Sequence, residues 1–315
     1  MKKLLLGSLT ILFCTSIVAQ NAINLKLNLE KNRLYRLKSV SEQTVSQTVN
    51  GVQQSTEVKV SYTLSLKMID ATADFMVAEV HFDTLITKTN AMGKLISASS
   101  VGEGDIKSAE MGDVLSCIMN RLSKNAIYVK LDFSGKPLEI VNQKMLSGMV
   151  LKDTSSITIA GQTGVAIKKQ IAELVSESNL ETLIGMFTWR LPATQVSEGD
   201  NWKMTQQMNS GGMELDILTT CHLDGITGNS ANITADSDIK AKDNADPIES
   251  GGAKVTYDDL RGLNKSNMVI NVGTGLLVRE TTKTHITGNL GISAPGFSMQ
   301  MPMDINGESK IVELQ

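Results

Sequence analysis

The chain has 315 residues, a formal net charge of −3 at neutral pH and no long run of like charges. Proteins that bind nucleic acids normally carry a basic face, so this balance argues against a nucleic-acid partner. Aromatic residues make up only 4% of the chain, whereas methionine occurs 16 times. We therefore expect an aliphatic, methionine-rich core in one large domain or two ordinary ones.

The first twenty residues have the pattern of a secretory signal peptide. Lys2 and Lys3 precede an uncharged stretch from Leu4 to Ala19, and polar Gln20 follows. A bilayer-spanning helix needs about 20 apolar residues, and no cluster of charges follows to stop transfer. We expect export to the periplasm or envelope of a Gram-negative bacterium, with cleavage near residue 19 or 20. An uncleaved anchor is the alternative, and no later segment reaches membrane-spanning length.

The three cysteines bear on lipidation and on disulfide formation. Cys14 follows bulky Phe13 and the apolar run continues after it, which disfavours a lipoprotein signal. Cys117 and Cys221 would remain in the exported chain. Their spacing leaves open whether they form a disulfide or stay two buried thiols, because bridging requires Cα atoms within about 7 Å.

Alternation of apolar and polar residues is the dominant pattern and predicts β-strands with one buried face. It is clearest over residues 58–66, 127–133, 213–223 and 268–272. Hairpin turns are expected at Asn50-Gly51 and at Gly211-Gly212.

Three segments have helical spacing of their apolar residues instead. They cover residues 105–124, where Asp105 is a candidate N-cap, 142–152, and 165–187 with a break near 176–179. The helices of 142–187 would connect two β-rich parts of the chain.

The two β-rich parts have similar patterns. Each begins with a long hairpin, near 34–69 and near 201–226, and continues with a strand, 74–88 and 229–240. Each also contains a strand, a tight glycine turn and a second strand, around Gly135 and around Gly275. An internal duplication explains this, although hairpin sheets resemble one another at this level.

The predicted organisation is therefore a signal peptide at 1–20, a first β-rich half at 21–141, a helical connector at 142–187 and a second half at 188–315. We expect a β-rich α+β fold with two related antiparallel sheets separated and packed by helices. In one version of this fold, each sheet is a half-barrel with a concave apolar face.

A distinctive string runs from Leu191 to Trp202. Pro192 ends the preceding helix, Gly199-Asp200 forms a turn, and Trp202 begins a strand as a core anchor. This proline, valine and Gly-Asp-x-Trp pattern resembles one in uncharacterised secreted proteins of Bacteroidetes, grouped as a domain of unknown function. The resemblance implies a location and an architecture, and it carries over no catalytic residues.

The sequence contains no recognised catalytic motif or cofactor fingerprint, and we expect no cofactor. The isolated His81, His222 and His285 are typical of strand surfaces, although a hydrolase site could assemble from one of them and a distant serine. The paired carboxylates Glu198 with Asp200, and Asp258 with Asp259, lie in turn-like contexts.

Met299, Met301 and Met303 alternate, so an extended chain points all three thioethers one way. Core packing explains this pattern most simply, and a surface for an apolar ligand or a Cu(I) site are the alternatives. The favoured function is non-enzymatic binding of a lipid-like ligand or an envelope protein. A hydrolase and a structural envelope component are the other hypotheses.

Overall fold

A single antiparallel sheet dominates the computed structural model, which describes residues 22–49, 51–157, 159, 164–210, 213–243, 245, 247–250 and 253–314. In this part of the chain thirteen strands follow the order β6-β5-β3-β2-β1-β13-β12-β11-β9-β8-β7, with β4 beside β3 and β10 beside β11. The strands are β1 (Leu34–Val49), β2 (Val52–Ala71), β3 (Met76–Ala91), β4 (Lys94–Ser99), β5 (Ile127–Leu131), β6 (Pro137–Ile140), β7 (Asn201–Ser210), β8 (Met213–Thr227), β9 (Ser230–Ala241), β10 (Ile248–Ser250), β11 (Ala253–Asn271), β12 (Leu277–Ala294) and β13 (Phe297–Leu314).

Pairing between β1 and β13 corrects the expectation of two sheets. These strands pair antiparallel from Arg36↔Leu314 to Gln47↔Met303. Each would otherwise present an unpaired row of backbone N–H and C=O groups at the edge of its half, and the pairing satisfies both rows. The two halves therefore form one sheet, and the half-barrel description is not confirmed.

The order of the strands is the same in both halves. Reading across the sheet, β6-β5-β3-β2-β1 is followed by β13 and then by β12-β11-β9-β8-β7. The turns that open the two halves also agree, because the amides of Asn32 and Gly199 donate to the carbonyls of Met68 and Leu223 at 2.9 and 2.8 Å. That the halves arose by duplication stays a prediction.

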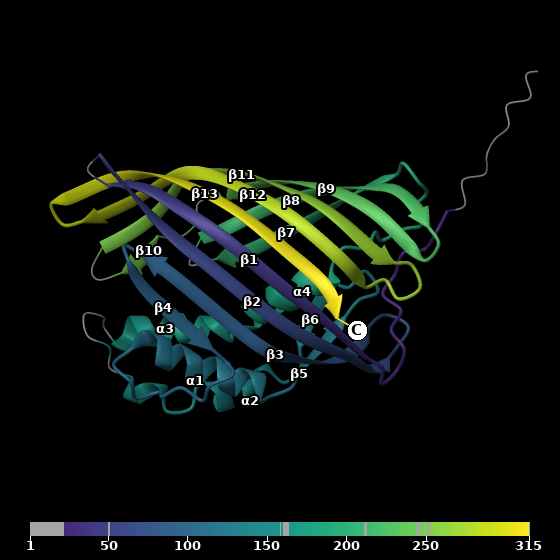
Figure 1. The fold of residues 1–315 in the computed structure, drawn as a ribbon, viewed down its shortest axis with the longest axis horizontal. Coiled ribbons are helices and arrows are strands. Elements are labelled where there is room, and N and C mark those ends of the chain that lie inside the picture. Colours follow the sequence, from purple (N-terminus) through teal and green to yellow (C-terminus); the bar gives the residue numbers. More distant parts are fainter. Residues whose placement is uncertain are drawn as a thin grey trace, which may run out of the picture.

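Helices gather on one side of the curved sheet (Figure 1). They are α1 (Met111–Ser123), α2 (Gln143–Val150), α3 (Gly164–Leu174) and α4 (Glu177–Thr188), with a short 3-10 helix at Thr154–Ser156. The expected break in the connector is present, since α4 starts after Ser176, whose hydroxyl accepts from the Asn179 amide at 3.3 Å. The helix expected from residue 105 begins only at Met111, and the Asp105 carboxylate instead accepts from the Lys107 amide in a turn.

Helix α4 contacts both β6 and β7, the strands at the two ends of the sheet order. The sheet therefore curves so far that its opposite edges lie on the same helix. At the β6 side the Thr188 hydroxyl donates to the Gly135 carbonyl at 2.6 Å, just before β6 begins. Beyond α4, Arg190 reaches back to the last turn of the helix.

The N-terminal arm, residues 22–33, links the two halves before the first strand begins. Leu25, Leu27 and Leu29 are buried in the main core. The Leu27 amide donates to Phe133 in the β5–β6 turn at 2.8 Å. The Asn28 amide donates to Thr274 in the β11–β12 turn at 2.9 Å. The arm thus fastens the two glycine turns to each other.

A second apolar cluster is separate from the main core and belongs mostly to the second half. Its buried members are Leu215, Ile217, Ile239, Leu260, Ile286, Met303 and Ile305.

Among the described residues, no helix is both long and apolar enough to span a bilayer. The expected signal peptide, Asn50 and the Gly211-Gly212 turn lie outside the described residues.

Replacing Gly275 with alanine tests the role of the arm. Gly275 has φ +72°, and a Cβ there would lie 2.3 Å from the Lys26 carbonyl oxygen. Gly296 has a similar φ of +77° with nothing within 4 Å, so Gly296→Ala is a matched control. We expect the control to lose about 1 kcal/mol of unfolding free energy and Gly275→Ala about 3 kcal/mol or more. Equal losses in urea denaturation would show that the arm does not pack there.

Candidate functional site

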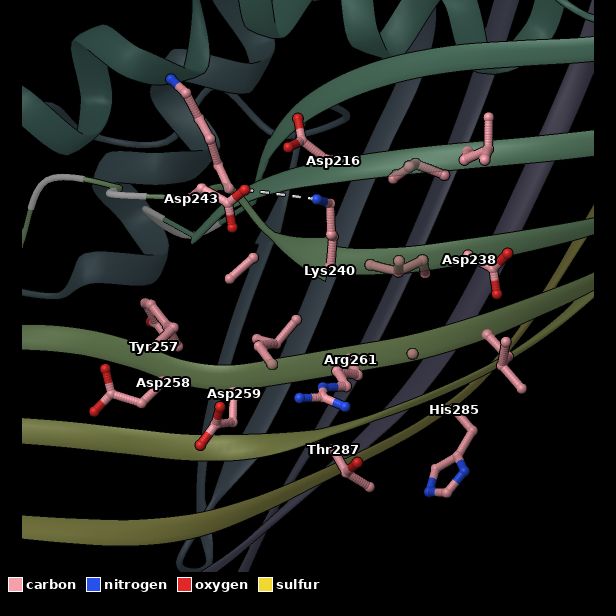
Figure 2. Close-up of a pocket in the computed structure, with 18 of the residues that line it drawn as sticks. Asp216, Asp238, Lys240, Asp243, Tyr257, Asp258, Asp259, Arg261, His285 and Thr287 are labelled. Carbon is pink, nitrogen blue, oxygen red and sulfur yellow. Dashed lines mark ion pairs between the residues drawn. The ribbon is translucent and has the colours of Figure 1, made fainter.

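A large cleft lies where β9 separates from β11. These strands pair only as far as Lys240↔Arg261. Beyond that point β9 ends at Ala241, whereas β11 runs back to Ala253 and pairs with the short β10. The separation leaves a cleft of about 1320 Å³ that is open to solvent (Figure 2).

An irregularity in β11 shapes one wall of this cleft. The pairing of β11 with β12 shifts between Asp258 and Arg261, and Asp259 has a φ of +51°. Such a bulge re-aims the neighbouring side chains and increases the local twist. Leu260 turns inward and is 2% exposed, while Asp258, Asp259 and Arg261 border the cleft (Figure 2).

The cleft brings together side chains from both faces of the sheet. Ile217, Ile239 and Leu260 belong to the second apolar cluster and form the buried part of the cleft. Leu218 and Leu263 line the outer part and are 40% and 55% exposed. The cleft thus connects the solvent with an apolar cluster. Ligand sites are usually clefts of this kind, lined mostly by apolar side chains.

Charged side chains surround these apolar residues (Figure 2). The acids are Asp216, Asp238, Asp243, Asp258 and Asp259, and the bases are Lys240, Lys242 and Arg261. Lys240 forms an ion pair with Asp243 at 3.7 Å, and Lys242 forms one with Glu214 at 2.7 Å. Both ion pairs are accessible to solvent. Acids therefore outnumber bases around the cleft, which disfavours an anionic group there.

A smaller cavity of about 250 Å³ lies between the end of α4 and the inner face of the sheet. Its lining includes Cys221 on β8, Glu280 on β12 and Arg190 after α4. Burial raises the pKa of the Cys221 thiol to about 11, with nearby Glu280 acting in the same direction and Arg190 opposing it. The thiol therefore stays protonated at neutral pH and is a poor nucleophile.

The methionine stripe lies on β13. Met301 and Met303 are 6% and 5% exposed, and Met303 packs in the second apolar cluster. The methionines that line the interior cavity are others, namely Met186, Met204, Met208 and Met268. Packing accounts for Met301 and Met303, and ligand contact by Met299, Met301 or Met303 stays a prediction.

Cys117 and Cys221 are both free and buried, on α1 and β8. The alternative of two buried thiols is thus the one that the structure contains. Among the described residues no group of three or more histidine, cysteine or acidic side chains is arranged to hold a metal ion.

The Gly-Asp-x-Trp string has a local structural role. Gly199 has φ +89°, and the Asp200 carboxylate accepts from the Ser197 amide at 2.7 Å, which closes the turn before β7. Trp202 packs against the main core. Glu198, the other acid of the pair, accepts from the Ile226 amide at 2.8 Å, so both carboxylates bind backbone groups.

Each histidine has a polar partner on the sheet surface. His81 lies 3.3 Å from Glu79, His222 2.9 Å from the Asn201 side chain and His285 3.2 Å from Asp304. In the described part of the chain none of these contacts brings a histidine to a serine hydroxyl. His285 borders the large cleft (Figure 2).

Sequence patterns did not indicate Arg190, Glu280 or Asn264, which line the interior cavity. Glu280 lies in a run of polar residues, Arg279 to Thr282, that shows no apolar alternation. Its inward position follows only from the register of β12 against β11, in which it faces Met268.

A family model described as a family of unknown function, DUF6263, matches residues 73–277, about two thirds of the chain. The chain belongs to this family. The expectation of a family of unknown function is thus confirmed. No curated protein matches the DUF6263 chain.

Several solved structures are distantly similar to this DUF6263 protein. Lipovitellin is similar over 91% of the chain at 11% identity and a TM-score of 0.47, and the chain spans 26% of its length. An outer membrane channel from Pseudomonas putida F1 is similar over 91% of the chain and 97% of its own, at 9% identity and a TM-score of 0.25.

The raised pKa of Cys221 predicts a stability change at high pH. The unfolded thiol titrates near 9.0 and the folded one near 11. The protonated Cys221 thiol therefore contributes fully to the free energy of unfolding below pH 9, and this contribution is lost as the pH rises towards 11. We expect Cys221→Ala to reduce the fall in unfolding free energy between pH 9 and 11 by on the order of 2 kcal/mol. Ser237→Ala, in the same cavity but without a titrating group, should keep the wild-type slope.

Proposed function

We propose that this protein is an exported, non-enzymatic binding protein that takes a lipid-like apolar ligand into the cleft between β9 and β11. The observation that carries the proposal is that this solvent-open cleft reaches three buried members of the second apolar cluster, Ile217, Ile239 and Leu260. Buried apolar residues are normally covered by other parts of the chain, and an open route to them is typical of a ligand site.

The size and lining of the cleft support an elongated ligand. Its volume of about 1320 Å³ exceeds the roughly 300–1,000 Å³ of most small-molecule sites. Apolar side chains continue from Leu263 and Leu218 outside to Ile239 and Leu260 inside. An alkyl chain could therefore lie along this path and bury its surface against both sets of residues.

The charges around the cleft favour one class of head group. Five aspartates against three bases leave the rim acidic, and two of those bases already pair with acids. An anionic head group would be repelled, so we expect the ligand to be neutral or cationic at its polar end.

Export is part of the proposal and rests on the sequence before residue 21. Two lysines, an uncharged apolar stretch and the Ala19-Gln20 junction support a cleaved signal peptide. The setting of Cys14 supports release rather than lipid anchoring. The site would then face ligands of the periplasm or envelope.

Binding of the neutral probe N-phenylnaphthylamine tests the cleft. We expect Leu218→Ser and Leu263→Ser each to weaken binding about tenfold, because each removes apolar surface from the outer wall. Leu95→Ser is the matched control, since Leu95 is 64% exposed on β4 and does not line the cleft. Exposed positions such as these should change stability by less than about 0.5 kcal/mol.

Fluorescence titration of the three variants decides the matter. If the control loses as much affinity as the cleft variants, or if the probe fails to bind at all, the cleft is not the ligand site. Loss of binding to an envelope protein in the same variants, without any effect on the probe, would instead identify a protein partner.

N-terminal sequencing of the protein from fractionated Gram-negative cells tests export. We expect periplasmic protein that begins at residue 20 or 21, because cleavage follows the small residue at the end of the apolar stretch. Its intact mass should contain no acyl group. A cytoplasmic protein that starts at Met1, or an acylated one that starts at Cys14, would contradict the proposal.

A further inference from the structure

The interior cavity contains a buried carboxylate with one oxygen that accepts no hydrogen bond from the described residues. Glu280 is only 6% exposed and lines the cavity on β12. One oxygen, Oε1, accepts from the Thr282 hydroxyl at 3.1 Å. The other, Oε2, has no hydrogen-bond partner among the described residues. Buried polar atoms are nearly always paired, so an unpaired carboxylate oxygen indicates a missing donor.

The cation near Glu280 does not supply that donor. Arg190 Nη2 lies 3.6 Å from Glu280 Oε2, which is an ion pair but not a hydrogen bond. The guanidinium instead donates to the carbonyls of Trp189 at 2.6 Å and Met186 at 3.1 Å. Arg190 is thus held by the end of α4, and Oε2, although ion-paired with Arg190, has no hydrogen-bond donor among the described residues.

A second unpaired acceptor lies in the same cavity. Asn264 Oδ1 on β11 is buried and has no hydrogen-bond partner in the described part of the chain. Glu280 pairs with Met268, which lies four residues along β11 from Asn264. The backbone positions of Glu280 and Asn264 are therefore about 13 Å apart along the strand direction. Both unpaired atoms are acceptors, which indicates that the missing group is a donor.

The rest of the lining suits a molecule that is partly apolar. Met204, Met208 and Met268 contribute flexible thioether side chains, and Ser266 and Thr282 contribute hydroxyls. A volume of about 250 Å³ holds about eight water-sized groups, since each occupies roughly 30 Å³. The cavity therefore has room for a short aliphatic molecule.

We propose that this cavity binds the primary ammonium group of an aliphatic amine. The ammonium has three N–H donors and no acceptor, and its charge complements Glu280 Oε2. The alkyl part would pack against the methionines, and a second donor, where the ligand has one, would reach Asn264. This cavity shares Ile217 with the cleft between β9 and β11, but the inference does not depend on the function proposed for that cleft.

A groove between α4 and the edge strand β7 offers an entrance. It has a volume of about 340 Å³ and shares Met186, Arg190, Gln206 and Met208 with the cavity. A free amine or the amino head group of a lipid could enter here, because both present the same ammonium group.

Calorimetric titration with n-butylamine and 1,4-diaminobutane, with butan-1-ol as the neutral match, tests the site. We expect the amines to bind and the alcohol to bind at least about tenfold more weakly. Glu280→Gln should weaken amine binding about tenfold or more, because it removes the charge from the acceptor. Glu57→Gln, which removes an exposed carboxylate on β2, is the matched control and should bind as the wild type does.

Asn264→Asp keeps the inference testable if Glu280→Gln does not fold. It adds a carboxylate at the far end of the cavity and should raise the affinity for 1,4-diaminobutane more than that for n-butylamine. Equal binding of alcohol and amine, full affinity in Glu280→Gln, or no diamine preference in Asn264→Asp would each overturn the proposal.

Two lysolipids separate the sources of the ammonium group. If lysophosphatidylethanolamine binds in a Glu280-dependent way and lysophosphatidylcholine does not, the natural ligand is an amino head group. If only the short amines bind, it is a free amine. Either result supports the site, whereas binding of neither the short amines nor the lysolipid overturns it.

Discussion

Contact of one helix with both edges of the sheet is the constraint on which the rest of the structure depends. A strand at the edge of a sheet has unpaired backbone groups and is prone to pair with other chains. Here β6 and β7 both lie against α4, so the helix covers the space between them. The curvature that this requires creates the inner face on which the interior cavity lies. It also fixes Arg190, which follows α4, beside Glu280 on β12.

The segments that precede each half strengthen this arrangement by crossing to other parts of the fold. The N-terminal arm passes its backbone close to Gly275 in the second half, and the end of α4 passes close to Gly135 in the first. Both glycines have positive φ values and leave no room for a side chain. Each half is therefore held by the segment that leads into the other. The β-sheet alone would leave these turns exposed.

Local elements of the fold were predictable, because they depend on neighbours in the sequence. Alternation identified the long strands, and helical spacing with the polar break at Ser176 separated α3 from α4. The single sheet was not predictable, since the pairing of β1 with β13 joins residues more than 250 positions apart. The same holds for the sites. The cleft depends on where β9 leaves β11, and Glu280 faces inward only because of its register, within a run of polar residues that resembles a solvent-exposed strand.

The pairing of β1 with β13 also constrains the order of events as the chain folds. The central pair of strands in the sheet combines β1 with β13, so it cannot form until β13 has been made. Contacts between such distant residues lower folding rates because a long loop must close first. Until then β1 has β2 as its only partner, and its other edge is open to neighbouring chains. A sheet whose centre closes this late would need protection from aggregation during synthesis, because the open edge of β1 can pair with neighbouring chains until β13 is in place.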